Sequence, residues 1–274
     1  MKTIIVATDF SAVSINAAKY AAEMAIDINA EILLINVYNI PVAFTDAPLL
    51  LISVDELRKS SEEQLENLKT ELLNSSPTLR IKLLAVMGDT IDELEKICAD
   101  VKPFAIVLGT KGVSNIEKVL FGSTTLTAIR HLTYPVISVP PEKSYGKGIK
   151  KIGFACDFKQ VETTTPVQAI KQFVTSFSAV LHVLNVDYHE KNFRADTPVQ
   201  SFHLHNMLED IHPQYHFIKN KEIDAGINEF AIANQLDMII AIPKKHKILE
   251  GIFKTSHSKQ IVLHSPIPVM CIHE

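Results

Sequence analysis

The residues best suited to bind an anion lie between positions 109 and 124. Three glycines fall within 14 residues there, and two hydroxyl residues follow the last of them: Gly109-Thr110-Lys111-Gly112, nine further residues, then Gly122-Ser123-Thr124. Glycine lets backbone N–H groups approach a phosphate closely, and a helix beginning at Ser123 would add free N–H groups and the positive end of its dipole. The pattern favours a phosphate site over the simpler alternative, a flexible turn with a helix-capping serine.

Asp9 is the candidate contact for the rest of such a ligand. It follows the apolar segment Thr3–Thr8 and precedes Ser14–Ala25, a stretch with helical periodicity. A carboxylate there accepts hydrogen bonds from a sugar or base, and it equally well caps the following helix. Both interpretations stay open on the residues alone. The Gly-x-x-x-x-Gly-Lys-Ser/Thr loop and the Gly-x-Gly-x-x-Gly turn are both absent.

Short apolar segments alternate with amphipathic stretches in the first half of the chain. The apolar segments are β-branched and apolar at successive positions, as in strands buried on both faces. They span Thr3–Thr8, Glu31–Val37, Lys82–Val86, Ala105–Leu108 and Val136–Val139. The other stretches predict helices at Ser14–Ala25, Ser53–Leu73, Asp89–Ala99 and Ser123–His131. This order predicts an α/β, Rossmann-like fold: an open five-stranded parallel sheet with helices on both faces, and a ligand at the carboxyl ends of the strands.

The same pattern occurs twice. Ile4–Phe10 recurs as Ile152–Phe158, and Ile32–Val37 recurs as Leu181–Val186, at offsets of 148 and 149. A nearly constant offset indicates duplication, because chance matches would scatter. The sequence therefore predicts two tandem domains of the same fold.

The two copies differ in length. The offset falls to 132 at Ile223-Asp224, which repeats Ile91-Asp92, so the second copy is shorter by 17 residues. A linker containing Pro140-Pro141 separates the copies, since prolines cannot extend a central strand. We place the domains at 1–146 and 147–274. The second copy keeps Asp157 in place of Asp9, at the offset of 148. At the offset of 132 it has lost the glycines, with Ala241, Lys244 and Lys254 in place of Gly109, Gly112 and Gly122.

Composition excludes several classes of protein. The chain has 274 residues and a formal net charge of −4, from 27 Lys+Arg and 31 Asp+Glu, which gives no reason to expect nucleic acid or a membrane surface as partner. No apolar run is long enough to cross a membrane, and three widely spaced cysteines fit a reducing cytoplasm. Ten of the 11 histidines follow residue 180, and their spacing favours solvated or partly buried side chains over a metal site.

The chain resembles a tandem universal stress protein, with two such domains spanning nearly its whole length. The family pattern Gly-2x-Gly-9x-Gly-Ser/Thr is matched by Gly109, Gly112, Gly122 and Ser123. The resemblance implies that Asp9 and Val37 hold the adenine and ribose of ATP. It also implies that the phosphates can carry a bound Mg²⁺ or Mn²⁺ ion. The residues that would bind the phosphates are Gly109, Thr110, Lys111, Gly112, Gly122, Ser123 and Thr124.

The resemblance further implies how the domains assemble. Domains of this family pair through their last strands, here near Val136–Val139 and Val269–Ile272, and a homodimer is expected. The second domain would then have a structural role beside a single nucleotide site.

Three functions remain open on the sequence. The first is an ATP-binding regulatory protein of the stress response, with at most slow hydrolysis because no acid/base pair stands beside the glycine segment. The second is an enzyme of the adenine-nucleotide α-hydrolase type, disfavoured because residues 9–14 lack the Ser-Gly-Gly-x-Asp-Ser loop. The third is an interaction module with both sites empty, disfavoured by the intact first motif.

Overall fold

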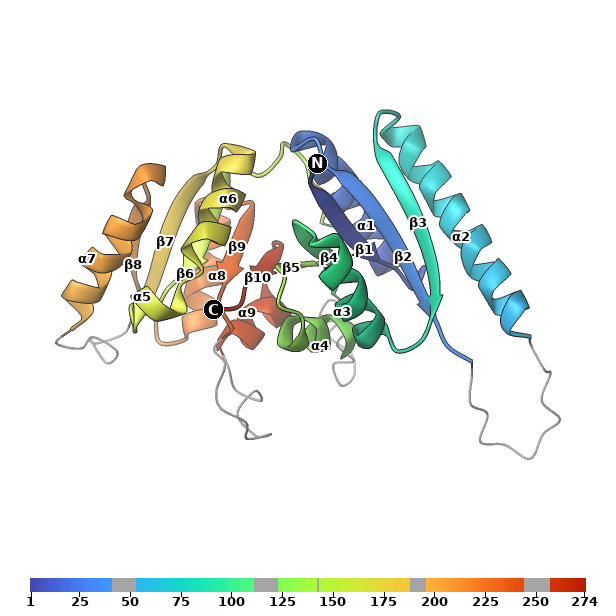
Figure 1. The fold of residues 1–274 in the computed structure, drawn as a ribbon. Coiled ribbons are helices and arrows are strands. Elements are labelled where there is room, and N and C mark those ends of the chain that lie inside the picture. Colours follow the sequence, from blue (N-terminus) through green and yellow to red (C-terminus); the bar gives the residue numbers. More distant parts are fainter. Residues whose placement is uncertain (41–52, 111–122, 142, 188–195, 244–256) are drawn as a thin grey trace.

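The computed structural model describes residues 1–40, 53–110, 123–141, 143–187, 196–243 and 257–274. Within these residues, the first half of the chain forms five strands and four helices in strict alternation (Figure 1). The strands are β1 (Thr3–Ala7), β2 (Glu31–Tyr38), β3 (Arg80–Met87), β4 (Ala105–Gly109) and β5 (Val136–Val139). The helices are α1 (Ala12–Asp27), α2 (Val54–Ser75), α3 (Thr90–Val101) and α4 (Ser123–His131).

The second half repeats this order with one helix broken. Its strands are β6 (Lys151–Ala155), β7 (Val180–Asp187), β8 (Gln214–Lys219), β9 (Met238–Ala241) and β10 (Val269–Cys271). Its helices are α5 (Val161–Thr164), α6 (Val167–Phe177), α7 (Thr197–Leu208), the 3₁₀ turn Glu209–Ile211, α8 (Ile223–Ala233) and α9 (His257–His264). Together α5 and α6 take the place of α1. They are separate helices because Pro166 lacks the N–H that a continuous helix would need there.

The ten strands of the described residues form one continuous sheet in the order β3-β2-β1-β4-β5-β10-β9-β6-β7-β8. Every pairing is parallel except the central one, where β5 and β10 run antiparallel with Ile137 opposite Met270. The predicted pairing of the two last strands is therefore present within the chain. Strands β3 and β8 are the outer strands, and a homodimer stays a prediction.

Two hydrophobic cores lie on opposite faces of this sheet. Side chains at alternate strand positions enter different cores: Ile4 and Val6 pack with α1 and α2, whereas Ile5 packs with α3 and α4. Helices α6 and α7 share the face of α1 and α2, and α8 and α9 share the other. The α/β fold with helices on both faces is confirmed (Figure 1). Among the described helices, none is long and apolar enough to span a membrane.

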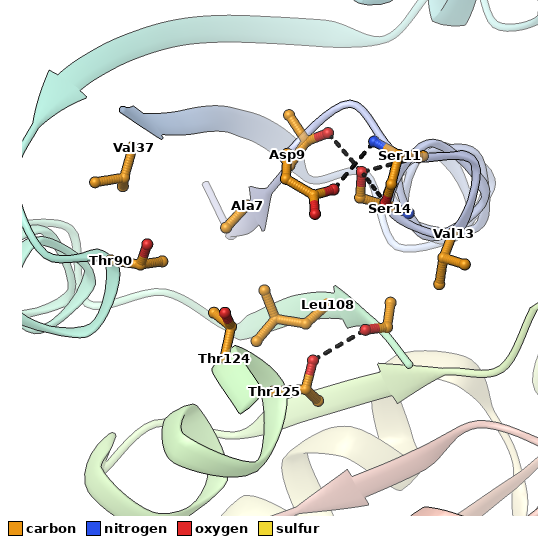
Figure 2. Close-up of a pocket in the computed structure, with 12 residues that line it drawn as sticks. Ala7, Asp9, Ser11, Val13, Ser14, Val37, Thr90, Leu108, Thr124 and Thr125 are labelled. Carbon is orange, nitrogen blue, oxygen red and sulfur yellow. Dashed lines mark hydrogen bonds between the residues drawn. The ribbon is translucent and has the colours of Figure 1, made fainter. Parts of the chain in front are cut away.

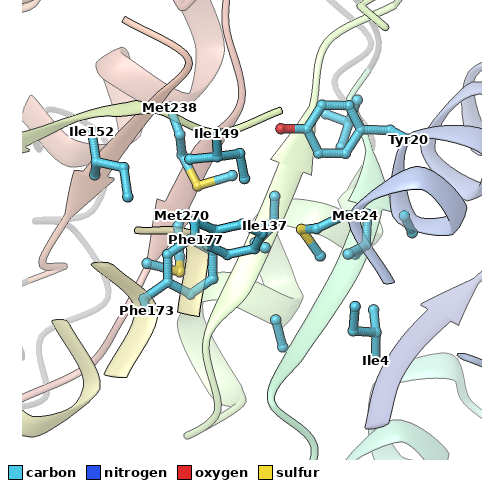
Figure 3. Packing of buried hydrophobic residues seen from close by; sticks show 14 of the residues in the cluster. Ile4, Tyr20, Met24, Ile137, Ile149, Ile152, Phe173, Phe177, Met238 and Met270 are labelled. Carbon is cyan, nitrogen blue, oxygen red and sulfur yellow. The ribbon is translucent and has the colours of Figure 1, made fainter. Parts of the chain in front are cut away.

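The first of these cores is continuous across both halves of the chain (Figure 3). Phe104, just before β4, stacks on Phe173 of α6 with ring centroids 5.2 Å apart. Beside this stack, the ammonium group of Lys2 donates to the Ser176 hydroxyl at 2.6 Å. The Tyr145 hydroxyl donates to an Asp27 carboxylate oxygen at 2.7 Å, which fixes the segment between β5 and β6 against the end of α1. The two halves are thus held together by core packing as well as by the central strands.

The strand register corrects the alignment of the two copies. Ile4 of β1 lies opposite Ala105 of β4, and Ile152 of β6 lies opposite Met238 of β9. The offset is therefore 148 at the first strands and 133 at the fourth, whereas the sequence predicted 132. The extra residue enters between β8 and α8, because Lys219 is still aligned with Met87 at an offset of 132.

The corrected offset changes which residues replace the glycines. The Thr125 hydroxyl donates to the Gly109 carbonyl at 2.9 Å, and the Ser258 hydroxyl donates to the Ile242 carbonyl at 3.2 Å. Gly109 is thus aligned with Ile242, and the prediction of Ala241 was wrong. At the same offset Gly112 and Gly122 are aligned with Lys245 and Thr255, in place of Lys244 and Lys254. The second copy still has no glycine at these three positions.

Two of the histidines of the second half contact each other. Nδ1 of His182 on β7 lies 3.0 Å from Nε2 of His216 on β8, and the His216 ring packs on Phe230 of α8. Burial lowers the pKa of both, and the proximity of His216 and Lys151 lowers that of His182 further. No group of three potential metal ligands occurs in the described parts of the chain.

This pair makes stability depend on pH. Because both folded pKa values lie below the ordinary value of 6.5, the unfolded chain binds protons first as the pH falls. The stabilising contribution is complete above pH 6.5 and is lost as the pH falls through the folded values. Urea unfolding at pH 7.5 and pH 5.5 measures it. We expect the free energy of unfolding to change less between these two pH values in H182F than in the unmodified protein. The control H131Q, at an exposed position, should show the same change as the unmodified protein. The same change in H182F as in the unmodified protein would contradict this account.

Candidate functional site

A pocket of about 120 Å³ opens at the carboxyl ends of β1 and β4 (Figure 2). These neighbouring strands mark the point where the strand order reverses direction, since β2 and β3 extend to one side and β5 to the other. Helices following strands on opposite sides of such a point leave a crevice between them, which is where open α/β sheets bind ligands. The pocket is lined by Ala7, Thr8, Asp9, Ser11, Val13, Ser14, Val37, Thr90, Leu108, Gly109, Thr124 and Thr125.

Asp9 stands in a tight turn between β1 and α1. Its carboxylate accepts a hydrogen bond from the backbone N–H of Ser11 at 3.0 Å, and Phe10 takes up the left-handed conformation with φ of 60°. Partial burial opposes ionisation of Asp9, but hydrogen bonds from Ser11 and Ser14 outweigh it, so its pKa is lowered. The side chain is exposed, ionised at neutral pH and free to accept further hydrogen bonds from a ligand.

Ser11 and Ser14 form the start of α1 beside this carboxylate. Ser11 is the N-cap, and its hydroxyl accepts from the backbone N–H of Ser14. The Ser14 hydroxyl lies 2.9 Å from that of Thr8. Sequence reasoning named none of the three as site residues, because single hydroxyl residues after a strand are usual helix caps. Their placement after β1, next to Asp9, was the signal that could have identified them.

Val37 and Thr90 form the opposite side of the pocket (Figure 2). Val37 lies near the end of β2. The last residue of β1, Ala7, pairs with Ile35, so Val37 has no partner in β1 and is open to the pocket on that side. Thr90 is the first residue of α3, and Asp89 caps this helix by accepting from the N–H groups of Ile91 and Asp92. Thr90 was also missed by sequence reasoning. It reaches the pocket only because α3 begins immediately after β3.

Gly109 and α4 form the floor of the pocket. A Cβ on Gly109 would lie 2.6 Å from the Val13 carbonyl oxygen, so this glycine lets the end of β4 pass close to the start of α1. The Thr125 hydroxyl donates to the Gly109 carbonyl and fixes the first turn of α4 against that strand. Thr124, in the same turn, is exposed toward the pocket.

The remaining predicted site residues are placed differently. Thr110 does not line the pocket; it is buried, and its backbone N–H and its hydroxyl both donate to the Val139 carbonyl, at 2.9 and 3.2 Å. Ser123 is the first residue of α4. Lys111, Gly112 and Gly122 lie outside the described residues. The structure thus brings Asp9, Val37, Gly109 and Thr124 together.

Electrostatics divide the pocket into two regions. Helix α4 begins with Ser123 and has no acidic residue in its first turn, so its own side chains do not neutralise the positive end of its dipole. Helix α3 also begins at the pocket, but Asp89 caps it and Asp92 and Glu93 occupy its first turn. An anionic group is therefore favoured beside α4, and an uncharged group beside Val37 and Thr90.

Comparison with known proteins decides the family. The model of the universal stress protein family matches residues 1–140 and again residues 148–273. The chain belongs to the universal stress protein family.

Individual relatives agree with this assignment. Two universal stress proteins of Methanocaldococcus jannaschii are 30% and 28% identical to the chain over 146 and 159 residues. Each alignment covers 52% of this chain, and the two cover 84% and 97% of the relatives. A universal stress protein of Archaeoglobus fulgidus has the same fold with a TM-score of 0.73 at 16% identity, over 99% of this chain and 98% of that one. The arrangement of two domains in one chain therefore occurs in another structure.

The second universal stress protein domain keeps the aspartate turn and changes its surroundings. Asp157 accepts from the backbone N–H of Lys159 at 3.1 Å, and Phe158 has φ of 52°, as in the first copy. Lys159 replaces Ser11, and its ammonium group lies 3.8 Å from the Asp157 carboxylate. A side chain of the protein itself thus provides the positive partner of this carboxylate.

The rest of this second turn is also closed by contacts within the domain. Glu162 replaces Ser14 and lies 2.7 Å from Nδ1 of His203 on α7. Gln200, on the same helix, accepts from the backbone N–H of Val161 at 2.9 Å. The first N–H of α5 is therefore already occupied, and Ile242 stands where the first copy has Gly109. Each change removes a feature that makes the first pocket suitable for a ligand.

Proposed function

We propose that the first domain binds an adenine nucleotide, ATP or ADP, and that the protein is a regulatory member of its family that responds to this ligand. The observation that supports the proposal is the convergence, in one pocket of a universal stress protein domain, of the Asp9 carboxylate, Val37, Gly109 and the start of α4. The two regions of the pocket match the two parts of a nucleotide, an uncharged base and a charged phosphate chain.

In this proposal each part of the ligand meets a matching group. The adenine lies against Val37 and Thr90, where the pocket wall carries no charged side chain. A ribose hydroxyl donates to the Asp9 carboxylate, whose lowered pKa keeps it an acceptor at neutral pH. The phosphates lie at the start of α4 beside Ser123 and Thr124, with Lys111, Gly112 and Gly122 of the motif completing their binding. Mg²⁺ or Mn²⁺, when bound, would neutralise phosphate charge.

The same pocket favours binding over turnover. Among its described lining residues, Asp9 is the single titratable side chain. A general base works best with a pKa near the working pH, and hydrogen bonds from Ser11 and Ser14 move Asp9 away from it. We therefore propose that ATP hydrolysis, if it occurs, is slow, and that the nucleotide acts by setting a conformation or an assembly state.

The nucleotide content of the purified protein tests this proposal. We expect acid denaturation of the full chain to release about one ATP or ADP per chain, and chromatography of the supernatant identifies it. Nucleotide-free protein should show a higher melting temperature when Mg-ATP is added, since a ligand that binds only the folded state stabilises it. Absence of both released nucleotide and a thermal shift would exclude the proposal and favour an interaction module. Multiple turnovers with a co-substrate would favour an enzyme.

A further inference from the structure

The second domain contacts the helix whose other end forms the phosphate side of the pocket. His273 follows β10, and its Nε2 donates to the carbonyl oxygen of Ile129 at 2.6 Å. Ile129 lies in the last turn of α4, where carbonyl groups run out of N–H partners within the helix. Because a carbonyl oxygen only accepts, the Nε2 atom must carry the proton. His273 is thus a C-terminal cap that one domain supplies to the other.

Among the described residues, the position equivalent to His273 makes no such contact in the opposite direction. At the offset of 133, which relates Ile137 to Met270 across the central strands, His273 is aligned with Pro140. Proline has no N–H and no polar side chain, so the first domain has no equivalent donor to offer α9 from that position. The cap from the partner domain therefore goes to α4, in the domain that keeps the nucleotide motif.

We propose that His273 is a positioning residue through which the second domain holds α4 in place for the phosphates of the nucleotide. The proposal rests on the proposed function, since it concerns the same pocket. Helix α4 has nine residues, roughly 13 Å, so a tilt at its last turn is carried to its first. The first turn is the part fixed to β4 by Thr125 and exposed to the pocket at Thr124.

Two effects act in the same direction. Satisfying the Ile129 carbonyl keeps the last turn of α4 from fraying, so its N-terminal N–H groups keep one orientation. A donor at the C-terminal end also complements the negative end of the helix dipole, which supports an anion bound at the opposite end. Both effects act first on the phosphate side of the pocket. The adenine side is formed by β2 and α3, and α3 has its own N-terminal cap at Asp89.

The affinities of H273A for ATP and for adenosine test the proposal. We expect calorimetry on nucleotide-free full chain to show ATP binding weakened about three- to tenfold, the size of one lost hydrogen bond, with adenosine binding unchanged. H273Q should restore ATP binding, because the Gln amide can donate to the same carbonyl. If H273A does not fold, H273L fills the space without a donor and replaces it in the comparison.

The matched control is H264A, a histidine at the end of the equivalent helix α9, which should bind ATP as the unmodified protein does. Equal ATP affinity in H273A and the unmodified protein would overturn the inference. Equal loss of ATP and adenosine binding would overturn it as well, because that result indicates a general loss of structure. If the unmodified protein binds neither ligand, the proposed function itself fails.

Discussion

Replacing Asp9 by Asn should abolish retention of adenine nucleotide, whereas the same change at Asp157 should leave it at the level of the unmodified protein. Asn keeps the shape of the side chain and the oxygen that accepts from the Ser11 N–H, so the turn is preserved. It removes the negative charge that a ribose hydroxyl would meet. Hydrogen bonds to charged groups contribute about 1.5–3 kcal/mol, which corresponds to a loss of roughly 10- to 150-fold in affinity.

Calorimetry with ATP on nucleotide-free D9N and D157N measures this difference. The two aspartates are matched: each follows the first strand of its domain, accepts from the N–H two residues later and precedes a phenylalanine in the left-handed conformation. They differ in that Lys159 lies beside Asp157. Equal losses in the two variants would mean that both domains bind nucleotide, and no loss in D9N would remove Asp9 from the site.

Replacing Phe173 by Ala should cause the largest loss of stability among the variants considered. Phe173 is 2% exposed and packs on Phe104 of the first domain and on Phe177 of its own helix, with ring centroids 5.2 and 4.9 Å apart. Truncating a buried Phe costs about 3–5 kcal/mol, because the apolar contacts are lost and a cavity remains. The loss should affect both domains together, since the stack joins them.

Urea unfolding followed by circular dichroism measures the free energy of unfolding of F173A. The control is F202A on α7, whose side chain is 63% exposed and should change stability by no more than about 0.5 kcal/mol. A loss in F173A as small as in F202A would show that the shared core contributes little. Hydrogen exchange shows where in the chain stability is lost. A loss of protection confined to the second half would contradict the joint stabilisation.

The element order and the position of the pocket could be predicted from sequence because both follow from local patterns. A short apolar run such as residues 32–35 is typical of a strand buried on both faces of a parallel sheet. A ligand site at the carboxyl ends of the strands follows from the parallel order. Residues that enter the pocket through neighbouring turns could not be predicted in this way. Ser11 and Thr90 are far apart in sequence, and only the alignment of β1 and β3 in the sheet brings them to the same pocket.

Two other expectations depended on details that the sequence does not contain. The match of Ile91-Asp92 to Ile223-Asp224 pointed to an offset of 132, but α3 begins at Thr90 and α8 begins at Ile223. One extra residue before α8 displaces the alignment, and an accidental match concealed it. The family resemblance implied that Thr110 takes part in the phosphate site. Its hydroxyl instead bonds to the neighbouring strand, an interaction that depends on the β4–β5 register.

The antiparallel junction of β5 with β10 has a consequence for how the protein works at low abundance. Two separate domains that associate through such strands dissociate on dilution. When a single gene encodes a one-domain protein, the two domains of such a pair must also be identical. Covalent linkage through a short connection keeps the effective concentration of the partner at about millimolar whatever the amount of protein in the cell. Under the proposed function, a pair of domains with one nucleotide site is then inherited as a unit. The second half is free to accumulate histidines and lose glycines without any competition from symmetric, two-site assemblies.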